Sequence, residues 1–262
     1  IFSKNNNQWK AKPISSEQAV QFQQALDQFQ IGHPLVHSSY LINLAAPDKA
    51  LWKRSIDALI VELQRAHQLG IPYVVLHPGA FTTSSEAAGI KRIIQALNEV
   101  DAQTRDLQTI CLLENTAGQG TCLGWQFEQM AAMLDGVKSP EHVGVCLDTC
   151  HAHAAGYALT EAKDYRRTMK IFGELIGFHR LKAIHLNDSK RELGSRVDRH
   201  EHIGEGHLGN QAFRNLLHDR RVLKTPMYLE TPKGTHPRTG KSWDLFNLRR
   251  LRRLAALKSR PK

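Results

Sequence analysis

Six short apolar runs in this chain each close on, or just before, residues that can bind a metal ion. The runs are rich in Val, Ile and Leu and only about four to eight residues long, which is typical of strands buried on both faces of a sheet. A single metal-capable residue at the end of a strand is usually structural. Six apolar runs that all end in this way predict a shared site. A seventh stretch, VDRHEHIG, is expected to form a polar loop and adds two more metal-capable residues. The full set is His37, His77, Glu114, Asp148, His151, His185, Asp198, His200 and Glu230.

Segments with apolar spacing near 3.6 residues separate these runs and predict helices. They are Glu17–Phe29, Asp48–Leu69, Glu86–Ala102, Trp125–Leu134, Lys163–Ile176, Gln211–Leu217 and Trp243–Leu257. Alternating strands and helices predict parallel strands with right-handed crossovers, in an open doubly wound sheet or a closed barrel. The closed (β/α)8 TIM barrel is favoured, because only a ring points nearly every strand end at one axis.

The length of 262 residues, without a linker or repeat, fits one TIM-barrel domain over residues 1–262. Residues 243–262 are expected to form a basic C-terminal helix and tail of that domain. Only seven strands are found, counting a fragment at Ile1–Lys4, whereas the barrel needs eight. We therefore expect the chain to be truncated, lacking the natural first strand and helix, with a mature or naturally shortened form as the alternative.

The sequence has no apolar run long enough to span a membrane and no signal peptide, so no membrane partner is expected. Its four cysteines lack the spacing of zinc ligands, which favours a reducing, intracellular compartment. This would be the cytoplasm in a bacterium, and a nuclear or mitochondrial location stays open.

The candidate set contains five imidazoles and four carboxylates. Four carboxylates in one pocket would repel one another unless cations compensate them. Histidine and carboxylate ligands suit Zn, Mn or Fe(II), and the share of imidazole favours zinc. Nine ligands are too many for one ion and suit two or three. Three divalent ions would leave a formal charge of +6 − 4 = +2, which suits the hydrolysis of a phosphodiester.

The whole chain is basic, with 35 Lys and Arg against 25 Asp and Glu, a formal net charge of +10. Basic residues concentrate at Lys190–Arg199 and at Arg249–Arg260. Such an excess suits a polyanionic partner, although the C-terminal RRLRRL can equally be a solvated helix face.

Longer motifs resemble one family, the endonuclease IV family of zinc-dependent apurinic/apyrimidinic endonucleases. They cover essentially the whole chain: HSSYLIN from His37, LHPG from Leu76, LLENTAGQG from Leu112, LDTCHAHAAGY from Leu147, HLNDSK from His185, DRHEHIGEGHLG from Asp198 and LETPKG from Leu229. The resemblance implies a DNA-repair barrel that cleaves duplex DNA 5′ to abasic sites and removes blocked 3′ ends.

The same resemblance implies three zinc ions per chain. His37 and His77 are similar to terminal ligands of one ion, and Glu114, the expected catalytic residue, to a carboxylate shared with a second. Asp148, His185 and Glu230 would complete the second ion. A third would be held by His151, Asp198 and His200. No side-chain nucleophile is implied, since the metal ions would activate water.

Two loops resemble the DNA-contacting segments of the family. Tyr40 and Leu41 are similar to residues that wedge into the base stack while the abasic nucleotide is extruded. In SKNNNQW, Asn7 stands where family members commonly have Arg, which implies a weaker probe of the duplex. We expect the chain to act as a monomer.

Two alternative functions are consistent with parts of the sequence. A metal-dependent sugar isomerase shares the barrel and a Glu, Asp and His centre, but usually holds fewer ions and gives no reason for the DRH loop. A non-catalytic DNA-binding fragment would keep the basic surface without cleavage. Metal stoichiometry separates the first from a repair nuclease, and nicking of abasic duplex separates the second.

Overall fold

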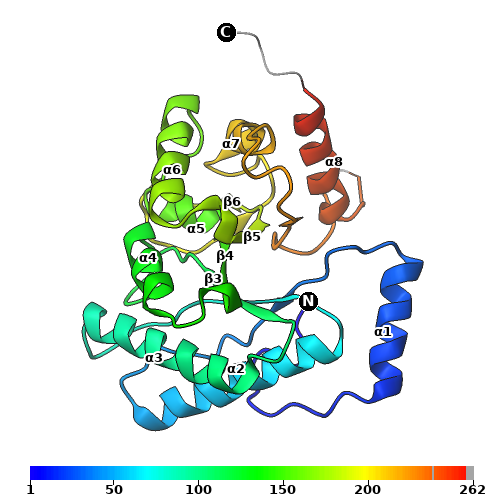
Figure 1. Cartoon of the computed structure of the whole chain (residues 1–262). Coiled ribbons are helices and arrows are strands. Elements are labelled where there is room, and N and C mark those ends of the chain that lie inside the picture. Colours follow the sequence, from blue (N-terminus) through cyan, green and yellow to red (C-terminus); the bar gives the residue numbers. More distant parts are fainter. Residues whose placement is uncertain (238, 258–262) are drawn as a thin grey trace. The chain divides into compact units, whose positions relative to one another are not determined.

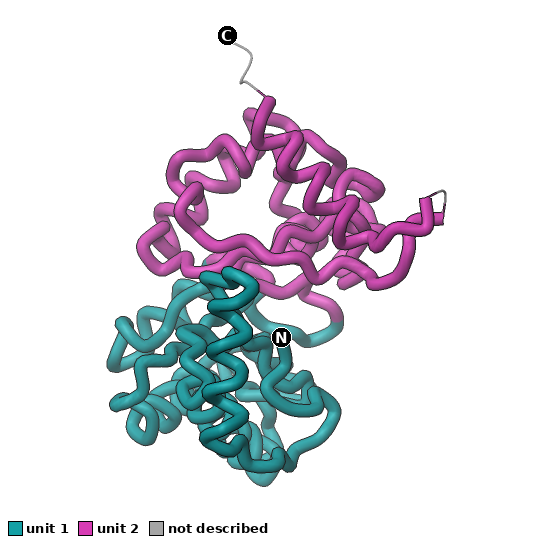
Figure 2. Tube along the Cα trace, turned by 90° about the vertical axis from the view of Figure 1, so that its right-hand side faces the viewer, with its two compact units in different colours: residues 1–114, 120–124, 128–145 teal, residues 115–119, 125–127, 146–262 magenta. Residues whose placement is uncertain are grey.

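The computed structural model describes residues 1–237 and 239–257. These residues form two compact units (Figure 2). The first unit comprises residues 1–114, 120–124 and 128–145, and the second comprises 115–119, 125–127 and the described residues from 146 onward. Each unit holds part of the predicted metal set.

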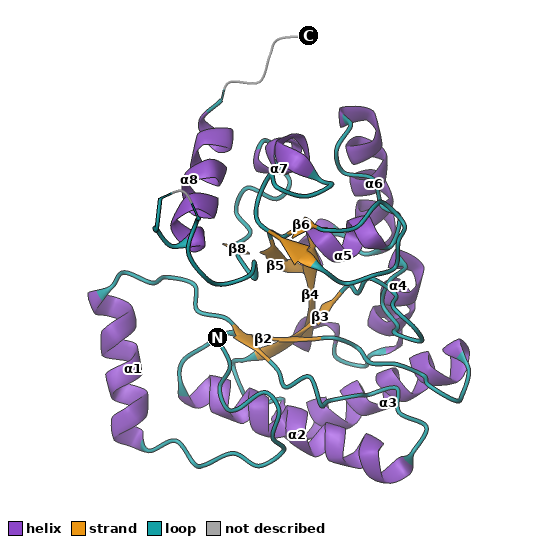
Figure 3. Cartoon of the chain, turned by 180° about the vertical axis from the view of Figure 1, so that it is seen from behind, coloured by secondary structure: helices purple, strands orange, loops and turns teal. Residues whose placement is uncertain are grey.

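Helices and strands alternate along the chain (Figures 1 and 3). The elements are α1 (Ser16–Gln28), β1 (Val36–His37), α2 (Lys49–Gln68), β2 (Tyr73–Leu76), α3 (Glu86–Thr104), β3 (Ile110–Glu114), α4 (Phe127–Gly136), η1 (Pro140–His142), β4 (Val143–Asp148), α5 (Thr149–Ala154), α6 (Ala162–Leu175), η2 (Phe178–Arg180), β5 (Leu181–His185), β6 (Asp188–Ser189), β7 (His200–Glu201), α7 (Gly209–Leu217), β8 (Met227–Tyr228) and α8 (Trp243–Ala256).

In the first unit, β1, β2 and β3 pair in parallel in that order. Val36 pairs with Val74, and Leu76 pairs with Leu113. This register brings the carboxyl ends of the three strands to one edge. His37 and Glu114 are the last residues of their strands and His77 directly follows β2, so the register delivers all three to that edge.

Helices α2 and α3 pack against each other in this unit (Figure 1). Each begins at a short polar side chain that accepts a hydrogen bond from the first turn: Asp48 from the Leu51 N–H at 2.7 Å, and Ser85 from the Ala88 N–H at 3.3 Å. Their apolar stripes are buried and supply much of the core. These stripes include Ile56, Leu59 and Leu63 of α2, and Ile93, Leu97 and Val100 of α3.

In the second unit, β5 and β8 pair in parallel, with His185 opposite Tyr228. The short strands β6 and β7 pair antiparallel, with Ser189 opposite His200. Phe127 is fully buried, stacked on Tyr157 with ring centroids 3.8 Å apart. The Phe172 ring meets Phe127 edge-on. Phe127 thus links Phe172 of α6 to Tyr157, which lies shortly after α5.

Every helix expected from the apolar spacing is present, with ends displaced by two residues at most. Three other expectations were wrong. Ile1–Lys4 is not a strand, although the Ile1 backbone donates to the Leu35 carbonyl and accepts from the His37 N–H, both at 2.8 Å. The run MYLETP was expected to form a buried strand, but β8 within it is only half-buried. The stretch VDRHEHIG was expected to be a loop, but His200 and Glu201 within it pair with β6 as the strand β7.

The C-terminal segment contains the helix that its apolar spacing predicts. Residues 243–256 form α8, and residues 258–262 of the predicted tail lie outside the described residues. Among the residues that the structure describes, no helix combines the length and the apolar character needed to cross a bilayer.

Candidate metal centre

Three predicted ligands converge in the first unit. The Nε2 atom of His37 lies 3.3 Å from Oε2 of Glu114, and Nε2 of His77 lies 3.1 Å from the same oxygen. Glu114 is completely buried and His37 nearly so, whereas the His77 side chain is about one-third exposed. The cluster therefore has one open side.

The protonation of His37 follows from its other nitrogen. Nδ1 lies 2.9 Å from the carbonyl oxygen of Ser38, which can only accept a hydrogen bond. Nδ1 therefore carries the proton, and in the neutral ring Nε2 directs a lone pair at the Glu114 carboxylate. Two electron-rich atoms at this distance repel each other unless a cation or a proton lies between them.

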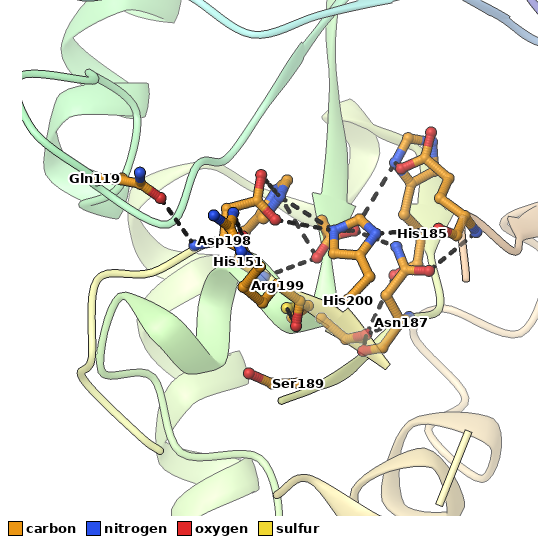
Figure 4. Close-up of polar contacts among 12 residues, drawn as sticks. Gln119, His151, His185, Asn187, Ser189, Asp198, Arg199 and His200 are labelled. Carbon is orange, nitrogen blue, oxygen red and sulfur yellow. Dashed lines mark hydrogen bonds and ion pairs between the residues drawn. The ribbon is translucent and has the colours of Figure 1, made fainter. Parts of the chain in front are cut away.

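A second group repeats this arrangement in the second unit (Figure 4). His151 Nδ1 lies 2.9 Å from the Asn115 carbonyl, and His200 Nδ1 lies 3.2 Å from the Glu230 carbonyl. The two Nε2 atoms then face each other at 3.3 Å, and they lie 3.2 and 3.4 Å from the two carboxylate oxygens of Asp198. Two lone pairs and a carboxylate thus share one small space.

The spacing of these atoms suits a metal ion. Two ligand atoms bound at about 2.0–2.1 Å to one tetrahedral zinc ion lie about 3.3 Å apart. The separations in both groups, 3.1 to 3.4 Å, match that value. Because the carbonyl contacts fix which nitrogen faces inward, the chemistry of the donor sets fits zinc.

Asp148 ends β4 and uses its two carboxylate oxygens differently. Oδ1 accepts the His151 N–H at 2.7 Å and so caps α5. Oδ2 lies 3.8 Å from His200 Nε2 and 4.0 Å from His185 Nδ1. The same His185 nitrogen lies 2.9 Å from Oε2 of Glu230. All six candidate ligands of the second unit therefore connect through short contacts.

Two asparagines missing from the predicted set complete this network. Asn115 accepts the Asp148 N–H at 2.7 Å and donates to the Asp148 carbonyl at 3.2 Å. Asn187 donates to Oδ2 of Asp148 at 2.6 Å (Figure 4). Each follows a candidate ligand by one or two positions, in LLEN and HLND. That adjacency is the signal that could have found them.

The loop that carries Asp198 and His200 is anchored by Asp188. This fully buried carboxylate accepts backbone N–H groups from Ser189, Gly204, Leu208 and Gly209 at 2.8 to 3.2 Å. Gly206 fits beside it only because it lacks a side chain, since a Cβ there would lie 2.3 Å from the Ser189 carbonyl oxygen. These bonds, together with the buried side chains of Ile203 and Leu208, hold the loop in place.

The nearby cysteine is a weaker donor. Cys150 is buried next to Asp198 and His200, and burial raises the pKa of its thiol. Its Sγ donates to the Arg199 carbonyl at 3.7 Å.

The two predicted DNA-contacting segments lie together in the first unit. The Ser39 hydroxyl donates to the Asn6 carbonyl at 2.6 Å and accepts the Leu41 N–H at 3.3 Å. Tyr40 is 58% exposed, and its ring centroid lies 5.2 Å from that of His37 and 6.4 Å from that of His77. Asn7 is exposed in the adjoining N-terminal loop, next to Asn6. An exposed aromatic ring thus stands beside one candidate metal group.

Comparison with known proteins adds to this geometry. A family model described as a xylose isomerase-like TIM barrel matches residues 1–251. The probable endonuclease 4 of Chloroflexus aurantiacus is 48% identical over 234 residues, covering 89% of this chain and 82% of that protein. The probable endonuclease 4 of Geobacter sulfurreducens is 44% identical over 254 residues, covering 97% of this chain and 84% of that protein. The chain belongs to the endonuclease IV family.

Solved structures agree with membership of the endonuclease IV family. The crystal structure of endonuclease IV from Thermus thermophilus is 33% identical, with a TM-score of 0.81 over 97% of this chain and 87% of that one. A D-tagatose 3-epimerase-like protein has a TM-score of 0.71 at 17% identity, covering 92% of this chain and 83% of that one, and shows the fold alone. The predictions of a TIM barrel and of an endonuclease IV family enzyme are confirmed.

Proposed function

We propose that this chain is an apurinic/apyrimidinic endonuclease that hydrolyses the phosphodiester 5′ to abasic sites and removes blocked 3′ ends. The observation that carries the proposal is the pair of inward-facing imidazoles, His151 and His200: each Nδ1 contacts a backbone carbonyl, and the two Nε2 atoms face each other and Asp198. Such a cluster is built for a divalent cation. Family membership supplies the reaction class.

The metal assignment is part of the proposal. His37, His77 and Glu114 would hold one zinc ion. Asp148, His185 and Glu230 would hold a second, for which the family resemblance implies Glu114 as a further ligand. His151, Asp198 and His200 would hold the third. Bound zinc would supply Lewis-acid polarisation of the phosphodiester and a lowered pKa of attacking water.

The chain's own residues supply orientation and charge. The carbonyl contacts of His37, His151 and His200 keep their Nε2 lone pairs directed inward. The burial of Glu114 and Asp148 places two carboxylates out of water, where they interact strongly with cations. Three zinc ions against four carboxylates leave the formal charge of +2 that favours a phosphate group.

DNA recognition is assigned to the loop pair joined by Ser39. Tyr40 and Leu41 enter the base stack at the abasic nucleotide, and Asn7 approaches the duplex from the adjoining loop. The exposure of Tyr40, its position beside His37 and His77, and the Ser39 hydrogen bonds support this assignment. A neutral Asn7 adds no phosphate-neutralising charge. We propose that the chain acts on duplex DNA as a monomer.

The decisive experiment measures incision of a duplex with one central abasic analogue. Protein reconstituted with zinc is expected to nick the strand 5′ to the lesion, and a chelator is expected to abolish the nick. A second duplex with a 3′-phosphate tests removal of the blocked end. Binding without nicking would support the DNA-binding fragment instead. Epimerisation of D-tagatose with one bound ion per chain would support a sugar-converting enzyme.

A further inference from the structure

Asn187 is fully buried two residues beyond the end of β5. It is an amide and so does not belong to the predicted set of imidazoles and carboxylates. Its surroundings nevertheless consist of that set and its supports (Figure 4). A buried amide needs partners for its N–H and C=O groups, so the identity of those partners shows what the residue does.

The side chain of Asn187 joins two candidate ligands from different elements. Its Nδ2 donates to Oδ2 of Asp148 at 2.6 Å, and its Oδ1 accepts the backbone N–H of Glu230 at 2.9 Å. Asp148 ends β4, whereas Glu230 follows β8. One rigid amide plane therefore fixes the direction of a carboxylate and the backbone position of a second ligand.

The β5–β8 pairing explains why a side chain, and not the backbone, accepts the hydrogen bond from the Glu230 N–H. The Leu186 N–H donates to the Tyr228 carbonyl at 2.7 Å, which continues the parallel ladder one residue past β5. Beyond that point the Asn187 side chain, rather than a backbone carbonyl, receives the Glu230 N–H. The amide thus extends the ladder while it turns its other end toward Asp148.

Thr149 fixes the backbone from which this amide projects. Its hydroxyl accepts the Asn187 N–H at 2.9 Å and donates to the Asn187 carbonyl at 2.7 Å. Thr149 is the first residue of α5, directly after Asp148. The backbone of Asn187 and the end of β4 are therefore locked together, which leaves the short Asn side chain little freedom.

We propose that Asn187 is a positioning residue of the metal centre, which holds the Asp148 carboxylate and the Glu230 main chain in their metal-binding arrangement. This inference rests on the proposed zinc-binding function. Only asparagine satisfies all the contacts: aspartate has no donor for Asp148, leucine has neither group, and glutamine is one methylene longer. Hydrogen bonds to metal ligands of this kind typically contribute about 10- to 100-fold in metal affinity.

The test compares zinc affinity in the wild-type chain, Asn187→Ala and Asn215→Ala, measured by competition with a chromophoric chelator. Asn215 is the matched control, because its amide also donates hydrogen bonds, to the carbonyls of Leu159 and Thr160 at 3.0 and 2.8 Å, with no ligand involved. We expect Asn187→Ala to weaken the affinity of at least one site about 10- to 100-fold. Asn215→Ala should bind zinc like the wild type.

A spectroscopic measurement covers the case in which Asn187→Ala does not fold. Asn187→Asp keeps the size of the side chain and the acceptor for the Glu230 N–H, but has no donor for Asp148. Loaded with cobalt(II), it is expected to show shifted visible absorption bands, because the Asp148 carboxylate is no longer held in place. The thermal melting of metal-free protein checks that each variant is folded.

The outcomes separate this inference from the proposed function. Unchanged zinc affinity and unchanged cobalt bands in the folded Asn187 variants, with normal metal binding by the wild type, overturn the role of Asn187 alone. Weakened affinity in a chain that never incises abasic DNA leaves Asn187 in its role and refutes the proposed reaction. A wild-type chain that binds no divalent metal overturns both.

Discussion

Glu114 is central to the first candidate metal group, because the imidazole nitrogens of His37 and His77 approach the same oxygen of its carboxylate. Glu114→Gln keeps the shape and removes the charge. We expect loss of at least one zinc ion per chain and a fall in incision of several orders of magnitude. DNA binding should persist, since the basic surface is unchanged.

Elemental analysis, incision kinetics and duplex binding together check this prediction. Glu99→Gln is the matched control, since Glu99 lies on α3, half-exposed and paired with Lys53 at 2.5 Å. It should incise like the wild type. Full zinc content and normal incision in Glu114→Gln would contradict the assignment.

Asp219 gives a prediction on pH. Partial burial by itself raises the pKa of this carboxyl, but hydrogen bonds from Arg221 and Tyr165 outweigh burial and lower it below its ordinary value. A carboxyl with a depressed folded-state pKa contributes stability above its unfolded pKa of about 3.9 and loses it as pH falls through the lower folded value.

Urea denaturation of the wild type and Asp219→Asn from about pH 7 down to pH 3 measures this contribution. The wild type should be more stable by a constant margin down to about pH 5, and the margin should shrink below about pH 4. A margin that does not change with pH, or that grows on acidification, would show that the charge of Asp219 is not what stabilises the fold.

At the scale of elements, strand ends were the most predictable feature. The buried runs place His37, Glu114, Asp148 and His185 at the last position of a strand, as their sequence pattern predicts. In the first unit, the register of the hydrogen-bonded parallel strands then brings the ends of β1 and β3, with His37 and Glu114, to one edge. Because this pattern repeats along the chain, the candidate metal ligands can be predicted from the sequence without any tertiary contact.

The elements that sequence did not predict are those held by polar tertiary contacts. Helix α5 is only six residues long, too short for apolar periodicity, and it depends on the Asp148 cap. Strands β6 and β7 are two residues each and depend on the Asp188 carboxylate that gathers the following loop. Asn115 and Asn187 were missed for the same reason, because neither residue is itself a metal ligand.

The cap of α2 makes a prediction at this scale. Asp48→Ala removes the acceptor for the Leu51 N–H and should cost about 1 kcal/mol of stability. Asp57→Ala, on the exposed face of the same helix, removes only a surface ion pair with Lys53 and should cost less than about 0.5 kcal/mol. Chemical denaturation measures both, and equal costs would argue against the cap.

For the whole molecule, metal and fold are expected to be coupled. Ligands far apart in the sequence approach one another in each unit, with 77 positions between His37 and Glu114 and 49 between His151 and His200. Ions bound to the folded chain therefore stabilise it against unfolding. Chelation should lower the melting temperature, and added zinc should restore it. A site saturated at about 100 times its dissociation constant contributes about 2.7 kcal/mol.

Calorimetry with and without chelator checks this prediction, with magnesium addition as the control. Magnesium prefers oxygen ligands and octahedral geometry, so it should not restore the melting temperature. A melting temperature that changes neither with chelator nor with added zinc would show that the fold alone holds the ligand clusters together.

The two carboxylate oxygens of Asp148 have different roles, and this limits the substitutions that the protein tolerates at position 148. One oxygen caps α5, and the other faces the metal group and Asn187. Asparagine could cap but not supply the charge, glutamate could supply the charge but is too long for the cap, and serine could only cap. In a saturation library selected for survival of abasic damage, position 148 should therefore accept aspartate alone, whereas positions that only bind metal should admit an occasional alternative ligand.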